Sequence, residues 1–258
     1  MHRFYIPPVA WNPDDLRLDE AESHHALHVL RLKAGDKVVV FNGRGVEATA
    51  EIADDNASAK SGVRLRVRQM AKTPPLPCRI TLAQAVPKGK NMDFIVQKSV
   101  ELGAGAVLPL LSERVVSRLD PAESAARREK WQAVAIEAAK QCGQNWLPEI
   151  GLPQTPKAFF QTLGRGAFEL MLIASLQTDA RHLREYLADF AAARPNQPRP
   201  ASALVLVGPE GDFTPAELSL ARSAGCRPIT LGPIVLRVET AALYCLSVLS
   251  YELLSNAR

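Results

Sequence analysis

The chain has 258 residues, which is enough for one large domain or two smaller domains with packed cores. Apolar residues make up 47% of the chain and the formal net charge is +4, a mild excess that permits a polyanionic partner without requiring one. The longest apolar runs are too short to span a bilayer and no signal peptide is expected before Arg3, so we expect a cytoplasmic protein with no membrane partner.

The first 70 or so residues predict a β-rich unit with one short helix. Residues 37–41 and 46–52 are expected to form strands joined by a tight turn. Residues 63–68 alternate an apolar side chain with arginine, which is typical of a strand that buries one face. The arginine face has two interpretations. It could be a solvated edge, or it could be a phosphate-binding stripe, since neighbouring guanidiniums repel each other unless an anion lies between them.

No metal site is expected from the histidines or the cysteines. His24 and His28 share one helix face, but no carboxylate or thiol stands at a spacing that would supply a third ligand. The four cysteines are scattered without the paired spacing of a zinc site. We therefore expect them to be small buried apolar groups.

Residues 71–77 contain three prolines and predict a boundary between domains 1–72 and 73–258. After this boundary the pattern alternates between strands and helices, as in a largely parallel α/β sheet with helices on both faces. Strands are expected at 79–86, 106–110 and 168–174, and helices at 92–102, 120–141 and 179–192.

The stretch 203–241 organises the second domain. Residues 203–207 predict a buried strand, and the two glycines of 208–211 permit a turn that side chains would forbid. Residues 214–217 (TPAE) match a capping box with proline at the first helical position, so a helix should begin there.

A second glycine loop follows a strand expected at 228–231. Both loops leave the carboxyl ends of strands, where open α/β sheets bind ligands, but neither has the glycine pattern of a dinucleotide or P-loop site. The last helix, expected at 240–254, is apolar nearly all round and should be buried on more than one side. It could lie in the core or in a subunit interface, and we favour an interface.

The two loops resemble a known pair of motifs. GPEGDFTPAE at 208–217 and LGPIVLRVETA at 231–241 are similar to the cofactor loops of the SPOUT methyltransferases. Within that superfamily the chain most resembles the RsmE-type 16S rRNA (uracil-N3)-methyltransferases. The further segments that carry this resemblance lie at 3–7, 24–36, 41–45, 87–104, 112–116 and 137–150.

The resemblance implies a fold, a cofactor and partners. It implies an α/β SPOUT domain with a parallel sheet and a C-terminal trefoil knot, preceded by a small PUA-like β-barrel that binds RNA. It also implies S-adenosylmethionine as the cofactor, 16S rRNA or the small ribosomal subunit as the substrate, and a homodimer. Gln144 and Ile234 stand where the family usually has arginine, so two cations are missing from the family pattern.

Methyl transfer to uracil N3 requires that the weakly acidic N3 proton leave, and a nearby cation favours the resulting anion. Arg237 and Arg114 are therefore the expected catalytic residues. Glu210 and Glu239 are the acids identified in the two loops, and Glu239 is expected to cap the last helix. The expected cofactor residues are Leu206, Gly208, Glu210, Gly211, Leu231, Gly232, Val235, Leu236, Thr240 and Ala241. The expected RNA contacts are Arg3, Arg31, Arg64, Arg66, Arg68, Lys88 and Lys90.

Three other functions are compatible with parts of the sequence. A SPOUT enzyme could instead methylate a ribose 2′-hydroxyl, although the asparagine-containing first motif of that branch is absent. A protein with this fold could bind RNA without catalysis, although the intact loop glycines argue for an occupied pocket. A nucleotide-dependent α/β enzyme is disfavoured because the phosphate-binding patterns are missing.

Overall fold

The computed structural model describes residues 1–53, 62–89, 91–114, 119–164 and 166–255. The chain packs into two compact units, Met1–Pro75 with Ile136–Leu147, and Leu76–Ala135 with Pro148–Arg258. Among the described residues, no helix is both long and apolar enough to cross a membrane.

The first unit is built on a four-stranded sheet in the order β1-β2-β3-β4. β1 pairs parallel with β2, and the other pairs are antiparallel. The strands are β1 His2–Tyr5, β2 Lys37–Phe41, β3 Val46–Ile52 and β4 Leu65–Lys72. The strands predicted at 37–41 and 46–52 are confirmed. β4 extends through Ala71 and Lys72, which pair with β3, so the ladder continues into the stretch predicted as a boundary.

Short helical segments cover this sheet. They are a 3₁₀ turn at Pro8–Ala10, α1 at Glu20–His24 and a π-helical turn at His25–Val29. The Asp19 carboxylate accepts a hydrogen bond from Glu22 N at 2.8 Å, which fixes the start of α1. Phe4, Leu16 and Val38 are fully buried in the core of the unit.

Residues 144–147 pack against the β2–β3 turn of the same unit. Gly45 N donates to Asn145 O at 2.9 Å, and the Trp146 indole N–H donates to Thr73 O at 3.0 Å. The Asn145 side chain is 5% exposed and accepts a hydrogen bond from the Arg3 guanidinium at 2.6 Å. This segment follows α3 (Pro121–Cys142) in the chain, so the first unit includes residues that are distant in sequence.

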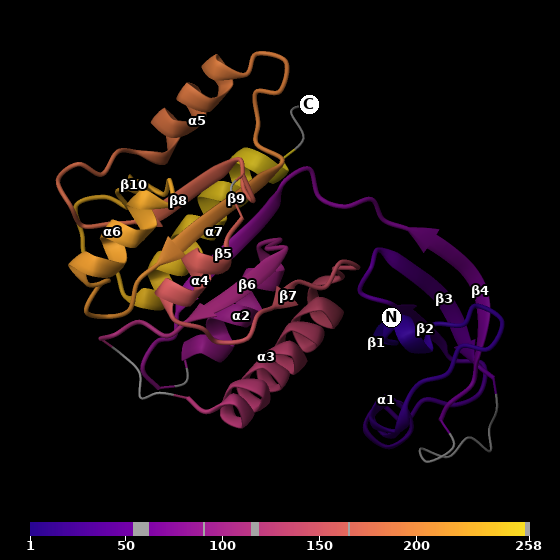
Figure 1. The fold of residues 1–258 in the computed structure, drawn as a ribbon. Helices are drawn as coiled ribbons and strands as arrows, with labels where there is room; N and C mark the ends of the chain where they lie inside the picture. The colour runs from indigo at the N-terminus through magenta and orange to yellow at the C-terminus, as the bar shows by residue number, and fades with distance from the viewer. Residues whose placement is uncertain (54–61, 90, 115–118, 165, 256–258) are drawn as a thin grey trace. The chain divides into compact units, whose positions relative to one another are not determined.

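The second unit contains a six-stranded sheet in the order β10-β8-β9-β5-β6-β7, and every neighbouring pair is parallel (Figure 1). Its strands are β5 Arg79–Ala85, β6 Ala106–Leu110, β7 Glu149–Ile150, β8 Leu170–Ala174, β9 Ser202–Val207 and β10 Arg227–Ile229. The predicted parallel α/β sheet is therefore confirmed.

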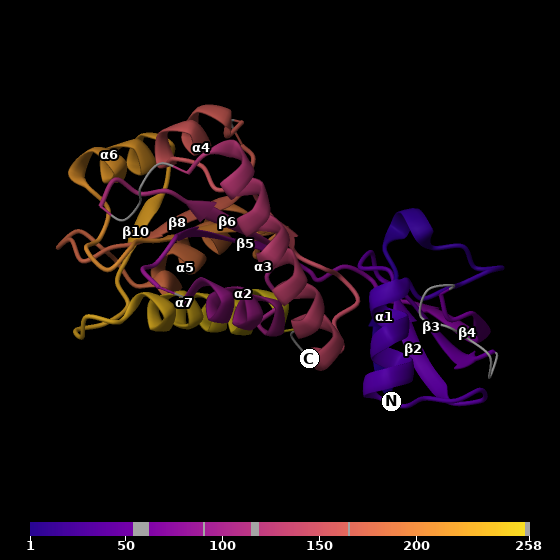
Figure 2. The same ribbon diagram turned by 90° about the horizontal axis from the view of Figure 1, so that it is seen from below.

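Helices cover both faces of this sheet. On one face lie α2 (Asn91–Glu101), α5 (Leu183–Ala193) and α7 (Val238–Leu254), and Figure 2 shows α2 and α7 side by side. On the other face lie α4 (Pro156–Thr162) and α6 (Pro215–Ser223). β9 contributes alternate residues to the two hydrophobic cores, because successive strand side chains point to opposite faces.

Local capping signals located some helix starts correctly and missed others. The box at Thr214 and Glu217 starts α6, and the box at Asp120 and Glu123 starts α3, as predicted. α5 begins at Leu183 rather than 179, because its first-turn Glu185 accepts a hydrogen bond from His182 N at 3.3 Å. Neither α4 nor β7 was predicted from the sequence.

α7 differs from the prediction in its start and in its burial. Arg237 occupies the N-cap position, so Glu239 lies in the first turn and is not the cap. Leu249 and Leu253 are 0% and 2% exposed, whereas Tyr244 and Tyr251 are 48% and 75% exposed. The helix therefore buries one face in its own core and presents tyrosines on the other.

Three of the four cysteines are buried as predicted, and Cys142 is exposed, which corrects the expectation for that residue. Burial raises the pKa of the Cys226 thiol and of the Cys245 thiol to about 12. These two thiols therefore remain protonated and act as apolar packing groups.

We expect Gly45→Ala to lower the free energy of unfolding by about 2–4 kcal/mol, through backbone strain and overpacking. Gly45 has φ +83, and a Cβ there would lie 2.6 Å from the Trp146 ring and 2.7 Å from Thr73 O. Gly35→Ala is the matched control, since Gly35 has φ +87 with nothing within 4 Å of a Cβ. Urea denaturation of both variants measures the difference, and equal losses would contradict the packing role of Gly45.

Candidate active site

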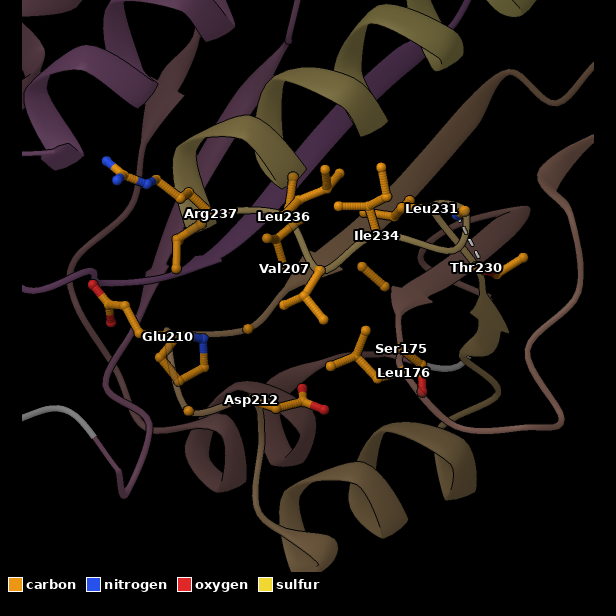
Figure 3. A pocket seen from close by; sticks show the side chains of 18 of the residues that line it. Ser175, Leu176, Val207, Glu210, Asp212, Thr230, Leu231, Ile234, Leu236 and Arg237 are labelled. Carbon is orange, nitrogen blue, oxygen red and sulfur yellow. Dashed lines mark hydrogen bonds between the residues drawn. The ribbon is translucent and has the colours of Figure 1, made fainter.

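A cavity of about 890 Å³ opens at the carboxyl ends of β8, β9 and β10 (Figure 3). Three loops line it: 174–177 after β8, 208–212 after β9 and 230–237 between β10 and α7. Parallel pairing brings these strand ends to one edge of the sheet, and the loops must satisfy the backbone groups there.

Most of the predicted cofactor residues line this cavity. They are Gly208, Glu210, Gly211, Leu231, Gly232, Val235, Leu236 and Ala241, together with Arg237. Leu206 does not line it, because its side chain points to the α4–α6 face of the sheet and Val207 faces the cavity instead. Thr240 is exposed and does not line it either.

Sequence reasoning missed the loop after β8 and one helix residue. Ala174, Ser175, Leu176 and Gln177 line the cavity, and so does Asn91 at the start of α2. A strand was predicted to end at residue 174, and this could have indicated a ligand-binding loop. The strand order of the sheet was also needed, because it shows which strand ends lie next to β9. Leu176 also contributes to an apolar rim, since it is 65% exposed and lines the same cavity as Ile234 at 72% and Val235 at 75%.

Asp212 is a second acid in the loop after β9, where the sequence analysis considered only Glu210. It has φ +60, a left-handed backbone conformation that non-glycine residues seldom adopt. Its Oδ1 accepts a hydrogen bond from Phe213 N at 2.7 Å, and a Cβ on Gly208 would lie 3.1 Å from that oxygen. Asp212 lines the cavity and lies near Leu176 in Figure 3, so the loop holds a carboxylate at the cavity wall.

The two glutamates of the lining contact neighbouring segments of the chain. Glu210 Oε1 accepts a hydrogen bond from Lys88 N at 3.0 Å, and Glu239 Oε2 accepts one from Asn91 Nδ2 at 3.2 Å. Arg237 and Glu210 extend toward the same side of the cavity in Figure 3. The described lining thus holds three acids and one arginine, an excess of negative charge that favours a cationic ligand.

Arg114 does not line the cavity itself but contacts a residue that does. Its Nη1 donates a hydrogen bond to the Gly211 carbonyl, and Gly211 itself lines the cavity. A Cβ on Gly211 would lie 3.4 Å from Arg114 Cδ, so the guanidinium stem packs directly on this peptide. Residues 115 and 116 of the resembling segment lie outside the described residues.

The arginines predicted to contact RNA in the first unit differ in their surroundings. Arg3 pairs with Glu47 at 3.0 Å, Arg64 with Asp15 at 3.1 Å and Arg68 with Glu51 at 2.6 Å. The Arg68 hydrogen bond holds the pKa of the Glu51 carboxyl below its usual value. Carboxylates of the chain itself therefore neutralise three of the arginines that were expected to bind RNA phosphates. The remaining predicted contacts are Arg31, Arg66 and Lys88, which are exposed, and Lys90, which lies outside the described residues.

No group of three or more metal-ligating side chains was found among the described residues. The rings of His24 and His28 lie 4.8 Å apart, as expected for one helix face. Two imidazoles alone do not make a zinc site.

Two family models match the chain. Residues 74–250 match an RNA methyltransferase domain, and residues 18–60 match an RNA methyltransferase PUA domain. The fold and the pocket thus define an RNA methyltransferase with a PUA domain. A ribosomal RNA small subunit methyltransferase E from Bacillus subtilis is 32% identical over 232 residues, which cover 90% of this chain and 88% of the relative.

Solved structures agree with this result. A methyltransferase from Legionella pneumophila with bound S-adenosylmethionine has a TM-score of 0.83 and 32% identity over 97% of both chains. A ribosomal RNA small subunit methyltransferase E from Neisseria gonorrhoeae, also bound to S-adenosylmethionine, has a TM-score of 0.81 and 29% identity over 98% of both chains. The chain belongs to the ribosomal RNA small subunit methyltransferase E family.

We expect Asp212→Asn to change the free energy of unfolding by less than about 0.5 kcal/mol, because asparagine tolerates the left-handed conformation and keeps an acceptor for Phe213 N. Asp212→Ala should lose about 1–2 kcal/mol through backbone strain and the missing hydrogen bond. Urea denaturation of the two variants measures both values. An alanine variant as stable as the asparagine variant would contradict the strained loop geometry.

Proposed function

We propose that this protein transfers the methyl group of S-adenosylmethionine to N3 of a uridine in the 16S rRNA of the small ribosomal subunit. The observation that carries the proposal is the cavity formed by the loops at 208–212 and 230–237, at the ligand-binding edge of the parallel sheet. Membership of the family supports the RNA substrate, and the SAM-bound Legionella and Neisseria structures support the cofactor.

The residues of the cavity fit S-adenosylmethionine. Val207, Leu231 and Leu236 supply apolar surface for the adenosine. Gly232 has φ +108 with nothing within 4 Å of a Cβ, so this loop leaves open space where a side chain would stand. The acidic lining complements the positive sulfonium, which supplies an electrophilic methyl group when the cofactor is bound.

Arg237 and Arg114 are the proposed sources of positive charge for the reaction. A cation beside uracil stabilises the base after loss of the N3 proton, and positioning of the base in line with the methyl group supplies much of the remaining rate. N3 lies on the Watson–Crick edge, so the target base must be unpaired or extruded before attack.

The finer architecture is also part of the proposal. We take the C-terminal segment to be a trefoil knot, supported by the two loops that share one cavity before α7 returns to pack on α2 and β5. Residues 1–72 are the proposed PUA-like RNA-binding barrel, supported by the PUA match and the four-stranded sheet. Within it, Arg31 and Arg66 are the exposed candidates for phosphate contacts.

The test of the reaction is nucleoside mass spectrometry of small-subunit RNA after incubation with labelled S-adenosylmethionine. We expect 3-methyluridine, and we expect Arg237→Ala to lower the single-turnover rate at least tenfold while S-adenosylhomocysteine affinity changes less than about twofold, since each factor of ten in rate corresponds to about 1.4 kcal/mol at the transition state. A methyl group on ribose would refute the N3 assignment alone. Absence of any transfer to ribosomal RNA would refute the proposed function.

We further propose a homodimer through the outer face of α7, which the resemblance to SPOUT enzymes implies. Tyr244 and Tyr251 leave large apolar rings exposed on this face, and Val248 lies between them, half-buried. Tyrosine is enriched at interfaces because it combines an apolar body with a polar tip. Leu249 belongs to the core of the chain, so its substitution would test folding rather than association.

Light scattering at micromolar concentration should give twice the mass of one chain for the wild type. Tyr251→Asp should shift the mass toward one chain without unfolding, because the charge would be buried unpaired in an interface. Val9→Asp is the control, since Val9 is 97% exposed in the first unit. A wild-type monomer would contradict the dimer.

A further inference from the structure

Glu217 is a buried carboxylate in the second unit, 4% exposed, in the first turn of α6. It accepts three hydrogen bonds, from Ser112 Oγ at 3.0 Å, Glu113 N at 3.0 Å and Thr214 N at 2.8 Å. No ion pair to it is found in the described part of the chain. Its charge is therefore stabilised by these donors and by the N-terminus of the helix.

Two of these three bonds exceed what helix capping requires. A capping box requires the glutamate carboxylate to accept only one hydrogen bond, from the N-cap backbone, which Thr214 supplies. The equivalent Glu123 of α3 is exposed and accepts a hydrogen bond from Asp120 N at 3.2 Å. The bonds from Ser112 and Glu113 instead connect α6 to the loop after β6.

These contacts link α6, the loop after β6 and the cofactor loop at 208–212 to one another. Glu217 holds Ser112 and Glu113, the next residue Arg114 donates to the Gly211 carbonyl, and the chain runs from Gly211 back to the cap of α6. Gly211 also lines the cavity, so Arg114 is bound to a peptide of the cavity wall. A shift of the Ser112 loop would therefore move Arg114 relative to the cavity.

We propose that Glu217 is a positioning residue that acts through Ser112 and Glu113 to hold Arg114 against the cofactor loop. This inference rests on the proposed function, because it gives Arg114 its place in the methyl-transfer reaction. Glu217 is not among the residues that line the cavity. Its role is to keep the guanidinium in one position while cofactor and RNA bind.

Ser112→Ala tests the proposal with the smallest change, because it removes one donor and leaves the α6 cap intact. We expect the single-turnover methyl-transfer rate to fall about tenfold and the S-adenosylhomocysteine Kd to stay within about twofold. Thr155→Ala is the matched control, since Thr155 Oγ1 caps α4 through Ala158 N at 3.2 Å in the same unit. It should lose stability through the missing cap and keep its rate.

Glu217→Gln is the second variant. Its amide has one acceptor oxygen for three donors, so it should lower the rate at least as much as Ser112→Ala. A double-mutant cycle with Arg114→Ala separates positioning from general support. If Glu217 and Ser112 act through Arg114, Ser112→Ala should cost nothing further in the Arg114→Ala background. A full tenfold loss from Ser112→Ala in the Arg114→Ala background would overturn the proposal. The proposal would also be overturned if the Ser112→Ala single variant had the same rate as Thr155→Ala.

Trypsin cleavage after Arg114 gives a readout that does not depend on activity. A guanidinium held on the Gly211 carbonyl is less available to the protease, so cleavage should be faster in Ser112→Ala than in wild type and Thr155→Ala. Unchanged cleavage would overturn the inference even if ribosomal RNA is methylated. Faster cleavage in a protein that transfers no methyl group would support the positioning role and refute the proposed function.

Discussion

The parallel pairing of β5 with β9 at the centre of the sheet is the constraint on which the site depends. Both strands are buried, and their register brings Gln84 opposite Val207 at the same edge. The chain therefore leaves both strands side by side, and the backbone groups at their ends require partners outside the ladder. The loop after β9 forms one wall of the cavity, and the loop after β5 contacts that wall through the hydrogen bond from Lys88 N to Glu210.

Glutamates provide much of that cross-linking. Glu210 binds the backbone after β5, Glu217 binds the loop after β6, and Glu239 binds the start of α2. Each carboxylate accepts a hydrogen bond from a segment that is distant in sequence. These hydrogen bonds, rather than apolar packing between the loops, hold the loops in place. Asp212 differs, because its carboxylate accepts a hydrogen bond from the adjacent Phe213 N, and it lines the cavity. Glu210 and Glu239 thus line the cavity and also bind a distant segment, whereas the carboxylate of Asp212 is bonded only within its own loop among the described contacts.

Features set by neighbouring residues could be predicted from the sequence, and features set by the sheet could not. The Thr214–Glu217 box and the strand at 203–207 depend on local propensity, and both were located correctly. Leu206 was predicted to bind the cofactor, but Val207 lines the cavity in its place, because β9 is apolar on both faces and no alternation indicates which side meets the cavity. The loop at 174–177 was missed because its place at the cavity depends on β8 pairing with β9.

The replacement of an expected arginine by Ile234 changes how charge is distributed around the cavity. Ile234 is 72% exposed and extends the apolar rim formed by Leu176 and Val235, so this position contributes contact area rather than charge. The positive charge assigned to the reaction then rests on Arg237, carried by the N-cap of α7, and on Arg114, held through the Gly211 peptide. Neither guanidinium has a carboxylate within ion-pair distance in the described structure, so neither charge is neutralised by a neighbouring acid. With fewer cations at the site, the precision with which each is held matters more for catalysis.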